Sequence, residues 1–264
     1  MTLTEAVAAL AVVTETARLD AEVLLAHAAG VERDQLVSRG LSDAPGFAAL
    51  VVRRLKGEPV AYITGTRGFW TIDLDVTPDV LIPRPDSETL IDAAVAHFGK
   101  RAPARVLDLG TGSGALLLAA LDQWPGATGL GIDASEAALV VARRNGGCIA
   151  PGRASFGIGD WAEGIDEPFD LILCNPPYIE DAAVLGPGVR EWEPHSALFA
   201  GDDGLDCYRI LAGQIPRVIA LGGVACIELG AGQAAAVAAL FADSGLTIGT
   251  RRDLGGHERC LMLT

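Results

Sequence analysis

The tetrapeptide Asn175-Pro176-Pro177-Tyr178 has the residue types best suited to chemistry, and it directly follows the apolar run 169–174. Because two prolines cannot continue a central strand, we expect the chain to leave a sheet here, at the edge where open α/β sheets bind ligands. The side-chain oxygen of Asn175 and the carbonyl of Pro176 can each accept one N–H of a planar NH2 group, against which Tyr178 can lie. Those hydrogen bonds strengthen as the nitrogen gains positive charge during attack, so the pattern predicts catalysis at a planar nitrogen.

The tetrapeptide alone does not show whether the substrate group is a carboxamide or the amino group of adenine, since both present two N–H donors. A nitrogen held in line with a methyl group can attack by direct displacement, and orientation then supplies much of the rate. No general base with a tuned pKa is needed before attack. The prediction from these residues is therefore methyl transfer to a planar nitrogen, with the substrate left open.

A glycine-rich loop predicts the binding site of the second reactant. It follows the apolar run 106–109, and its alternate glycines allow a sharp turn and a close approach to a ligand. With Ala115 the loop also fits the loose dinucleotide-binding pattern, so a nicotinamide enzyme is an alternative. Asp108 stands at the start of the loop, and its negative charge disfavours a pyrophosphate there. It favours S-adenosylmethionine, which carries a sulfonium, an ammonium and no phosphate. The predicted contacts in this loop are Asp108, Gly110, Thr111, Gly112, Ser113 and Gly114.

Acids also follow the next two predicted strands. Asp133 ends the run 130–132, where a carboxylate can accept hydrogen bonds from ribose hydroxyls. Asp160 and Trp161 follow the run 154–158, and there an acid can accept from the amine of adenine while an indole packs on the ring. These three residues complete the predicted cofactor site, with ordinary surface or capping roles as the alternative.

A parallel sheet is expected to position these segments. Short apolar runs alternate with helical patterns from residue 105 onward, which is typical of a doubly wound α/β sheet buried on both faces. The last two apolar runs flank Gly255-Gly256 and predict a terminal antiparallel hairpin. The predicted strands are 106–109, 130–132, 154–158, 171–174, 224–229, 246–251 and 260–263, with helices at 115–121, 135–144 and 205–219.

The chain before this sheet predicts a different architecture. Residues 1–66 show helical spacing of apolar residues, with Gly30 at a predicted helix end, and are expected to form a small helical bundle. Residues 67–85 contain a partial alternation and a turn at Thr77-Pro78-Asp79, which predict a β-hairpin linker. We expect residues 86–264 to form the catalytic domain.

Composition excludes several classes of protein. The formal net charge of −14 opposes general binding of nucleic acid. The longest apolar runs, 6–13 and 234–242, are too short to span a membrane, and the first five residues carry no basic segment typical of a secretory signal. The five cysteines and four histidines have no metal-ligand spacing, so we expect free thiols in the cytoplasm and no bound metal.

Further segments give a specific family resemblance. They are RLDAE at 18–22, GEPVAYITG at 57–65, LIPRPDSE at 81–88, EP at 193–194, AL at 197–198 and GDDGL at 201–205. With the glycine loop and Asn175–Tyr178, these segments make nearly the whole chain similar to the peptide chain release factor glutamine N5-methyltransferases of the HemK type. Asn-Pro-Pro-Tyr alone is shared with DNA adenine methyltransferases, whereas its combination with Ile-Pro-Arg-Pro is highly specific.

The resemblance implies a Rossmann-like, seven-stranded class I methyltransferase sheet behind the helical bundle. It implies methylation of the Gln side-chain amide in the Gly-Gly-Gln motif of release factors, the proteins of translation termination, which the helical domain would help to dock. The Gln would lie against Asn175, Pro176, Pro177 and Tyr178. We expect a monomer. The implied cofactor contacts are Gly110, Thr111, Gly112, Ser113, Gly114, Asp133, Trp161 and Asn175.

Two departures from the family pattern and several alternatives remain. Residues 86–88 read Asp-Ser-Glu where Glu-Thr-Glu is usual, and Ala162 stands where an aromatic residue is common, which leaves the outer wall of the adenine pocket uncertain. Arg84 fits a buried ion pair and a substrate contact equally well. The alternative functions are a ribosomal-protein glutamine methyltransferase, a nucleic-acid amino-methyltransferase and a binding module without catalysis.

Overall fold

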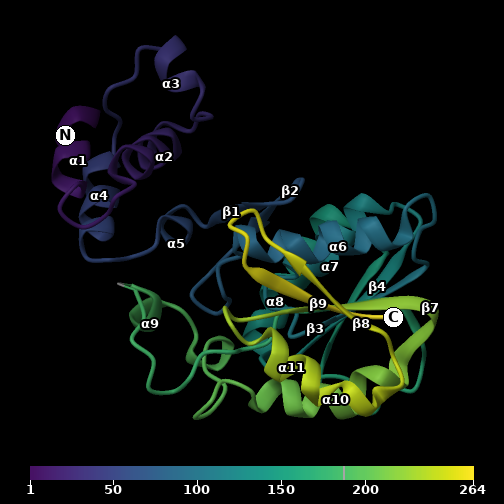
Figure 1. Ribbon diagram of the computed structural model, residues 1–264. Coiled ribbons are helices and arrows are strands. Elements are labelled where there is room, and N and C mark those ends of the chain that lie inside the picture. Colours follow the sequence, from purple (N-terminus) through teal and green to yellow (C-terminus); the bar gives the residue numbers. More distant parts are fainter. Residues whose placement is uncertain (187) are drawn as a thin grey trace. The chain divides into compact units, whose positions relative to one another are not determined.

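The computed structural model describes residues 1–186 and 188–264, which form two compact units (Figure 1). The smaller unit combines Met1–Thr66 with Leu185–Trp192, and the larger one combines Arg67–Val184 with Glu193–Thr264. In the part of the chain so described, no helix is long and apolar enough to cross a membrane.

The smaller unit is a helical bundle with its own core. Thr2 and Glu5 start the first helix with a reciprocal capping box, and Gly30 ends the second in a left-handed conformation with a φ of 64°, as its position in the sequence predicted. An ion pair of 2.7 Å between Arg54 and Asp20 joins the second and fourth helices. The helices are α1 (Leu3–Leu10), α2 (Ala17–Ala29), α3 (Gln35–Ser38), α4 (Phe47–Leu55), α5 (Val60–Thr64) and α9 (Val189–Trp192).

A short hairpin follows, formed by β1 (Thr66–Phe69) and β2 (Ile72–Asp75). Phe69 and Leu74 are buried in the core of the larger unit. The carboxamide of Asn145 holds β2 in place, since its Oδ1 accepts from Asp75 N at 2.9 Å and its Nδ2 donates to Asp75 O at 3.0 Å. The same Nδ2 donates to Ser113 O at 2.9 Å, so one buried side chain fixes the hairpin to the glycine loop.

A seven-stranded sheet organises the larger unit. Its order is β5-β4-β3-β6-β7-β9-β8, and β9 runs in the direction opposite to the other six strands of this sheet. The parallel sheet and the terminal antiparallel pair confirm the sequence prediction. The strands are β3 (Arg105–Leu109), β4 (Thr128–Asp133), β5 (Ala154–Ile158), β6 (Phe169–Cys174), β7 (Ile219–Glu228), β8 (Ile248–Arg252) and β9 (Glu258–Leu263).

Helices cover both faces of this sheet (Figure 1). Val106 of β3 packs with helices α6 (Glu88–Phe98) and α7 (Ala115–Gln123), whereas its neighbour Leu107 packs on the opposite face with α10 (Asp206–Val218) and α11 (Ala234–Leu240). This alternation along one strand is what a sheet buried on both sides requires. The helix α8 (Glu136–Ile149) lies on the α7 side, and short 3-10 turns occur at Pro85–Ser87, His195–Ala197 and Ala242–Ser244.

Two element boundaries differ from the sequence prediction by five residues, and helices α6 and α11 were not predicted. Helix α8 continues past residue 144 to Ile149 and passes through Gly146, where a Cβ would come within 2.6 Å of the Phe156 ring. Strand β7 begins at Ile219, five residues before the predicted start at 224, and a register shift with Gly222 at a φ of 76° separates its two paired parts. Both extensions contain glycines, which are poor helix and strand formers, and the sequence prediction therefore left them out.

Candidate active site

The glycine loop joins the end of β3 to the start of α7. Backbone N–H groups of Gly110 and Thr111 both donate to Ile132 O at 2.9 Å, which ties the loop to the end of β4. Gly110 has a φ of 71°, and a Cβ there would lie 3.2 Å from the Trp161 ring. A side chain at this position is therefore disfavoured by conformation and by space. Gly114 has a φ of 85° and caps α7.

Asp108 lies underneath this loop, at 1% exposure. Its Oδ2 accepts from Thr111 Oγ1 at 2.6 Å and from Leu117 N at 3.3 Å, whereas Oδ1 is buried without a hydrogen-bond partner among the described residues. Burial raises the pKa of Asp108 to about 7, and the nearby charge of Asp133 adds to this increase. The carboxyl therefore supports the loop from inside, and its predicted cofactor contact remains a prediction.

Asp133 ends β4 and faces the loop. Its Oδ2 accepts from Gly112 N at 2.8 Å and its Oδ1 accepts from Ser135 N at 2.9 Å. Ser135 caps α8, as the sequence predicted, by accepting from Ala138 N at 3.2 Å. Each carboxylate oxygen accepts one backbone N–H and still has a lone pair available, so Asp133 can also accept hydrogen bonds from a ligand.

Asp160 and Trp161 follow β5. Asp160 is exposed, and Trp161 is half-buried with a φ of 53°, a left-handed conformation that is rare for a large side chain. The next residue, Ala162, is fully buried in the core, and its N–H donates to Gln214 Oε1 at 2.7 Å. The small side chain that departs from the family pattern therefore points into the core.

The tetrapeptide leaves the sheet at the end of β6, as expected. Asn175 Nδ2 donates to Ser87 Oγ at 3.2 Å, and no hydrogen bond between described residues uses Asn175 Oδ1. Tyr178 donates from its hydroxyl to Glu228 Oε1 at 3.2 Å, and its carbonyl accepts from Gln233 Nε2 at 3.1 Å. Burial and the Glu228 charge raise the pKa of Tyr178, so this phenol is not a candidate base.

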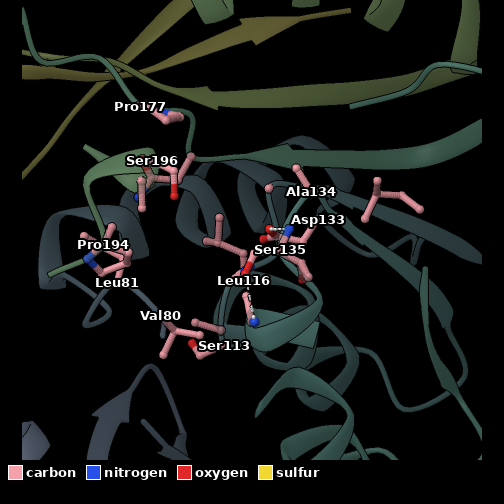
Figure 2. A pocket seen from close by; sticks show the side chains of 18 of the residues that line it. Val80, Leu81, Ser113, Leu116, Asp133, Ala134, Ser135, Pro177, Pro194 and Ser196 are labelled. Atoms are coloured by element: carbon pink, nitrogen blue, oxygen red, sulfur yellow. Dashed lines mark hydrogen bonds between the residues drawn. The ribbon is translucent and has the colours of Figure 1, made fainter. Parts of the chain in front are cut away.

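These segments surround one cavity of about 380 Å³, within the range of small-molecule sites (Figure 2). The predicted residues that line it are Gly110, Thr111, Gly112, Ser113, Asp133, Asp160, Trp161, Asn175 and Pro177. The other predicted residues lie outside the lining: Asp108, Gly114, Pro176 and Tyr178. The structure thus brings the glycine loop, both strand-end acids and the Asn175 corner to one space.

Two walls of the cavity are formed by residues that were not among those predicted for the cofactor site. One is formed by residues 79–83 and the other by residues 194–199, and Figure 2 shows Leu81 and Pro194 across from Asp133. An ion pair holds the walls together: Arg84 Nη2 bonds Glu193 Oε1, and Glu193 Oε2 accepts from Ile82 N at 3.2 Å. Segments 81–88 and 193–194 both carry the family resemblance, which was the available signal, but the Arg84–Glu193 pair joins positions 109 residues apart.

The lining fits S-adenosylmethionine. Among the described residues that line it are three carboxylates, Asp79, Asp133 and Asp160, and no lysine, arginine or histidine. Such a surface opposes a pyrophosphate and suits a cationic ligand without phosphate. The glycine loop also passes close to Trp161, because a Cβ added at Gly110 would lie 3.2 Å from the indole ring. The acidic lining therefore argues against the nicotinamide alternative.

Comparisons with known proteins agree with this site. Residues 2–65 match the family described as PrmC N-terminal domain, and residues 100–245 match the family described as Methyltransferase domain. The Release factor glutamine methyltransferase of Rhodospirillum rubrum is 46% identical over 259 residues, covering 94% of this chain and 79% of that protein. The protein of the same name from Caulobacter vibrioides is 44% identical over 255 residues, covering 92% of this chain and 88% of its own.

A solved structure of a methyltransferase from Pyrococcus furiosus aligns with a TM-score of 0.54 at 16% identity, covering 80% of this chain and 95% of that one. This likeness concerns the fold alone, and it confirms the predicted class I methyltransferase sheet. The fold, the acidic cavity beside a glycine loop and the identities of 44% and 46% lead to one conclusion. The chain belongs to the family of release factor glutamine methyltransferases.

Proposed function

We propose that this S-adenosylmethionine-dependent methyltransferase methylates N5 of the Gln side chain in the Gly-Gly-Gln motif of peptide chain release factors. The observation that carries the proposal is the Asn175 carboxamide at the lip of the cavity. Its Nδ2 is engaged by Ser87, and its Oδ1 has no partner among the described residues. An acceptor without a partner, beside the cofactor loop, is what recognition of a carboxamide N–H requires.

We propose the following roles for the residues at this corner. Asn175 Oδ1 and the Pro176 carbonyl each accept a hydrogen bond from one N–H of the Gln amide. Pro177 and Tyr178 orient the plane of that amide. Gly110, Thr111, Gly112, Ser113, Asp133, Asp160 and Trp161 hold the cofactor, with Asp108 and Gly114 supporting the loop. When bound, S-adenosylmethionine supplies an electrophilic methyl group on a cationic sulfur.

The rate contribution of Asn175 follows from charge development. The amide nitrogen is a weak nucleophile in its planar state and becomes positive as it attacks, so its N–H bonds to Asn175 and Pro176 strengthen in the transition state. Acceptance from such a charged donor contributes roughly 1.5–3 kcal/mol, or about 10- to 150-fold in rate. Loss of the proton can follow methyl transfer, because the methylated nitrogen is then a strong acid.

The direct test is incubation of the chain with isotopically labelled S-adenosylmethionine and a purified release factor, followed by mass mapping of the labelled peptide. We expect label on the Gln of Gly-Gly-Gln, and kcat reduced about 10- to 150-fold in Asn175→Ala at saturating cofactor. The matched control is a release factor with that Gln changed to Ala. Equal labelling of this control, or label only on a ribosomal protein or a nucleic acid, contradicts the proposal.

We further propose that the helical unit docks the release factor and that the enzyme acts as a cytoplasmic monomer, without binding nucleic acid directly. Support for docking comes from two strongly exposed valines on this unit, Val12 at 82% and Val37 at 89%. A charged residue at either position should raise KM for the release factor while leaving cofactor affinity unchanged. Light scattering of the purified chain tests the monomer.

A further inference from the structure

The backbone of the tetrapeptide Asn175–Tyr178 offers few groups through which the rest of the fold can hold it. Pro176 and Pro177 have no N–H, so neither can donate a backbone hydrogen bond. The tetrapeptide must still keep a fixed position, because a displacement of about 1 Å at a substrate-orienting group can cost roughly 100-fold in rate. At its carboxyl end, the carbonyl of Tyr178 accepts from Gln233 Nε2 at 3.1 Å. The fold therefore holds this end through a side chain that stands 55 residues further along the chain.

The carboxamide of Gln233 joins three segments. Gln233 directly precedes α11, and its Oε1 accepts from Gly230 N at 3.1 Å. Its Nε2 donates to Tyr178 O and, at 3.4 Å, to Gly204 O in the segment 201–205. All three partners are backbone groups, and since an N–H only donates and a carbonyl only accepts, one orientation of the carboxamide satisfies them. The turn after β7, the segment 201–205 and the tetrapeptide are therefore tied to one side chain.

Two glycines allow the backbone to come close to this carboxamide. A Cβ on Gly204, which has a φ of 68°, would lie 2.4 Å from Tyr178 O and 2.9 Å from Gln233 Nε2. A Cβ on Gly230 would lie 2.4 Å from Gln233 Oε1 and 3.0 Å from the Tyr178 ring. Because both positions lack a side chain, the Gln233 carboxamide can reach the Tyr178 backbone, and the close packing leaves it little room to move.

Tyr178 is held at both of its ends. Its hydroxyl donates to Glu228 Oε1 at 3.2 Å, and its carbonyl accepts from Gln233. We propose that Gln233 is a positioning residue for methyl transfer: its carboxamide fixes the carbonyl end of the tetrapeptide, and with it the Tyr178 ring that orients the substrate amide. Gln233 is not among the described residues that line the cavity, so it acts through Tyr178. This inference rests on the proposed function, because it names what holds the same corner.

Gln233→Glu is the sharpest test, since it keeps the size of the side chain and removes both N–H donors. An ionised carboxylate would place oxygen against two carbonyl oxygens, so we expect kcat to fall about 10- to 100-fold. KM for the release factor and the Kd of S-adenosylhomocysteine should stay within about twofold of the original. Gln233→Ala removes the carboxamide without adding charge and should lower kcat about 3- to 10-fold, so it tests the proposal even if Gln233→Glu does not fold.

Gln214→Glu is the matched control. Gln214 is half-buried in α10 of the same unit, and in the described part of the chain its carboxamide serves as an acceptor, through Oε1 from Ala162 N at 2.7 Å. The substitution makes the same chemical change and adds the same charge, but it keeps an acceptor. We expect kcat within about twofold of the original. A loss of kcat equal to that of Gln233→Glu would overturn the proposal, because the added charge and not the lost donors would then govern the rate.

The ring signals of Tyr178 give a measurement that does not depend on turnover. The chain has three tyrosines, so tyrosine labelled with 13C in its ring gives few signals, and those of Tyr178 are identified by their loss in Tyr178→Phe. In the cofactor-free protein, Gln233→Glu should shift or broaden the signals of Tyr178 more than those of Tyr62 and Tyr208.

The two measurements together decide the outcome. A fall in kcat without a change at Tyr178, or a change at Tyr178 without a fall in kcat, would overturn the positioning role. If the original chain methylates no Gln, the proposed function fails, and the ring signals still show whether Gln233 holds Tyr178.

Discussion

Arg84 and Glu193 form an unequal ion pair, and removal of either partner should therefore have a different cost. The Glu193 side chain is 2% exposed, whereas that of Arg84 is 36% exposed. Arg84→Met leaves a buried carboxylate with one backbone donor, Ile82 N at 3.2 Å. Breaking a fully buried pair costs about 3–5 kcal/mol, and partial access of water here reduces this to about 2–3 kcal/mol. Glu193→Gln leaves an arginine that can turn to water, at a cost of about 1 kcal/mol.

Urea unfolding of the two single variants and the double variant measures these costs as a cycle. We expect the double variant to be about 1–2 kcal/mol more stable than additivity of the single variants gives, because the buried charge is removed together with its partner. Hydrogen exchange at the Ile82 amide reports the same site locally. Equal costs for both single variants, or full additivity, would refute the reasoning. If Arg84 contacts substrate instead, Arg84→Met raises KM for the release factor and Glu193→Gln does not.

Three further predictions follow from the loop and its surroundings. Gly110→Ala should weaken cofactor binding measured by calorimetry, because a φ of 71° costs a non-glycine residue roughly 1–2 kcal/mol and its Cβ would meet Trp161 at 3.2 Å. Gly204→Ala should lower kcat in the methylation assay, since its Cβ would lie 2.4 Å from the Tyr178 carbonyl and displace that residue. Asp108 has a folded-state pKa of about 7 against an ordinary 3.8, so its ionisation removes stability as pH rises through that window. Asp108→Asn should flatten the fall in unfolding free energy between about pH 4 and 7 by at most about 1.4 kcal/mol per pH unit, as urea titrations at several pH values can show.

The sequence predicted the elements whose signals are local. Apolar runs that end in Gly110–Gly114, Asp133 or Asn175 predicted strands meeting a ligand edge, and the structure has β3, β4 and β6 ending there. Periodicity of this kind needs only neighbours along the chain, so it can be read without a structure.

Pairings between distant segments could not be predicted in the same way. Ser87 meets Asn175 across 88 residues, and Tyr178 meets Glu228 across 50. Glu228 ends a strand that reads as ordinary core, so no spacing marks it as a partner of the tetrapeptide. Asp108 is buried beneath its own loop, where its carboxylate accepts from the backbone N–H of Leu117 in α7. The turn of the loop brings that N–H to the carboxylate. Such contacts arise from topology and side-chain packing, which sequence patterns do not specify.

The smaller unit takes its chain from two separate stretches of the sequence, Met1–Thr66 and Leu185–Trp192. The stretches meet closely: a Cβ on Gly57 would lie 3.6 Å from Trp192 Nε1, and one on Gly188 would lie 3.0 Å from Gly57 O. A fragment ending at residue 66 would lack the second stretch, and one starting at 67 would carry it without its partners. Exchange of this unit between relatives should therefore succeed only as a chimera with two replaced segments, and the two segments should change together during evolution.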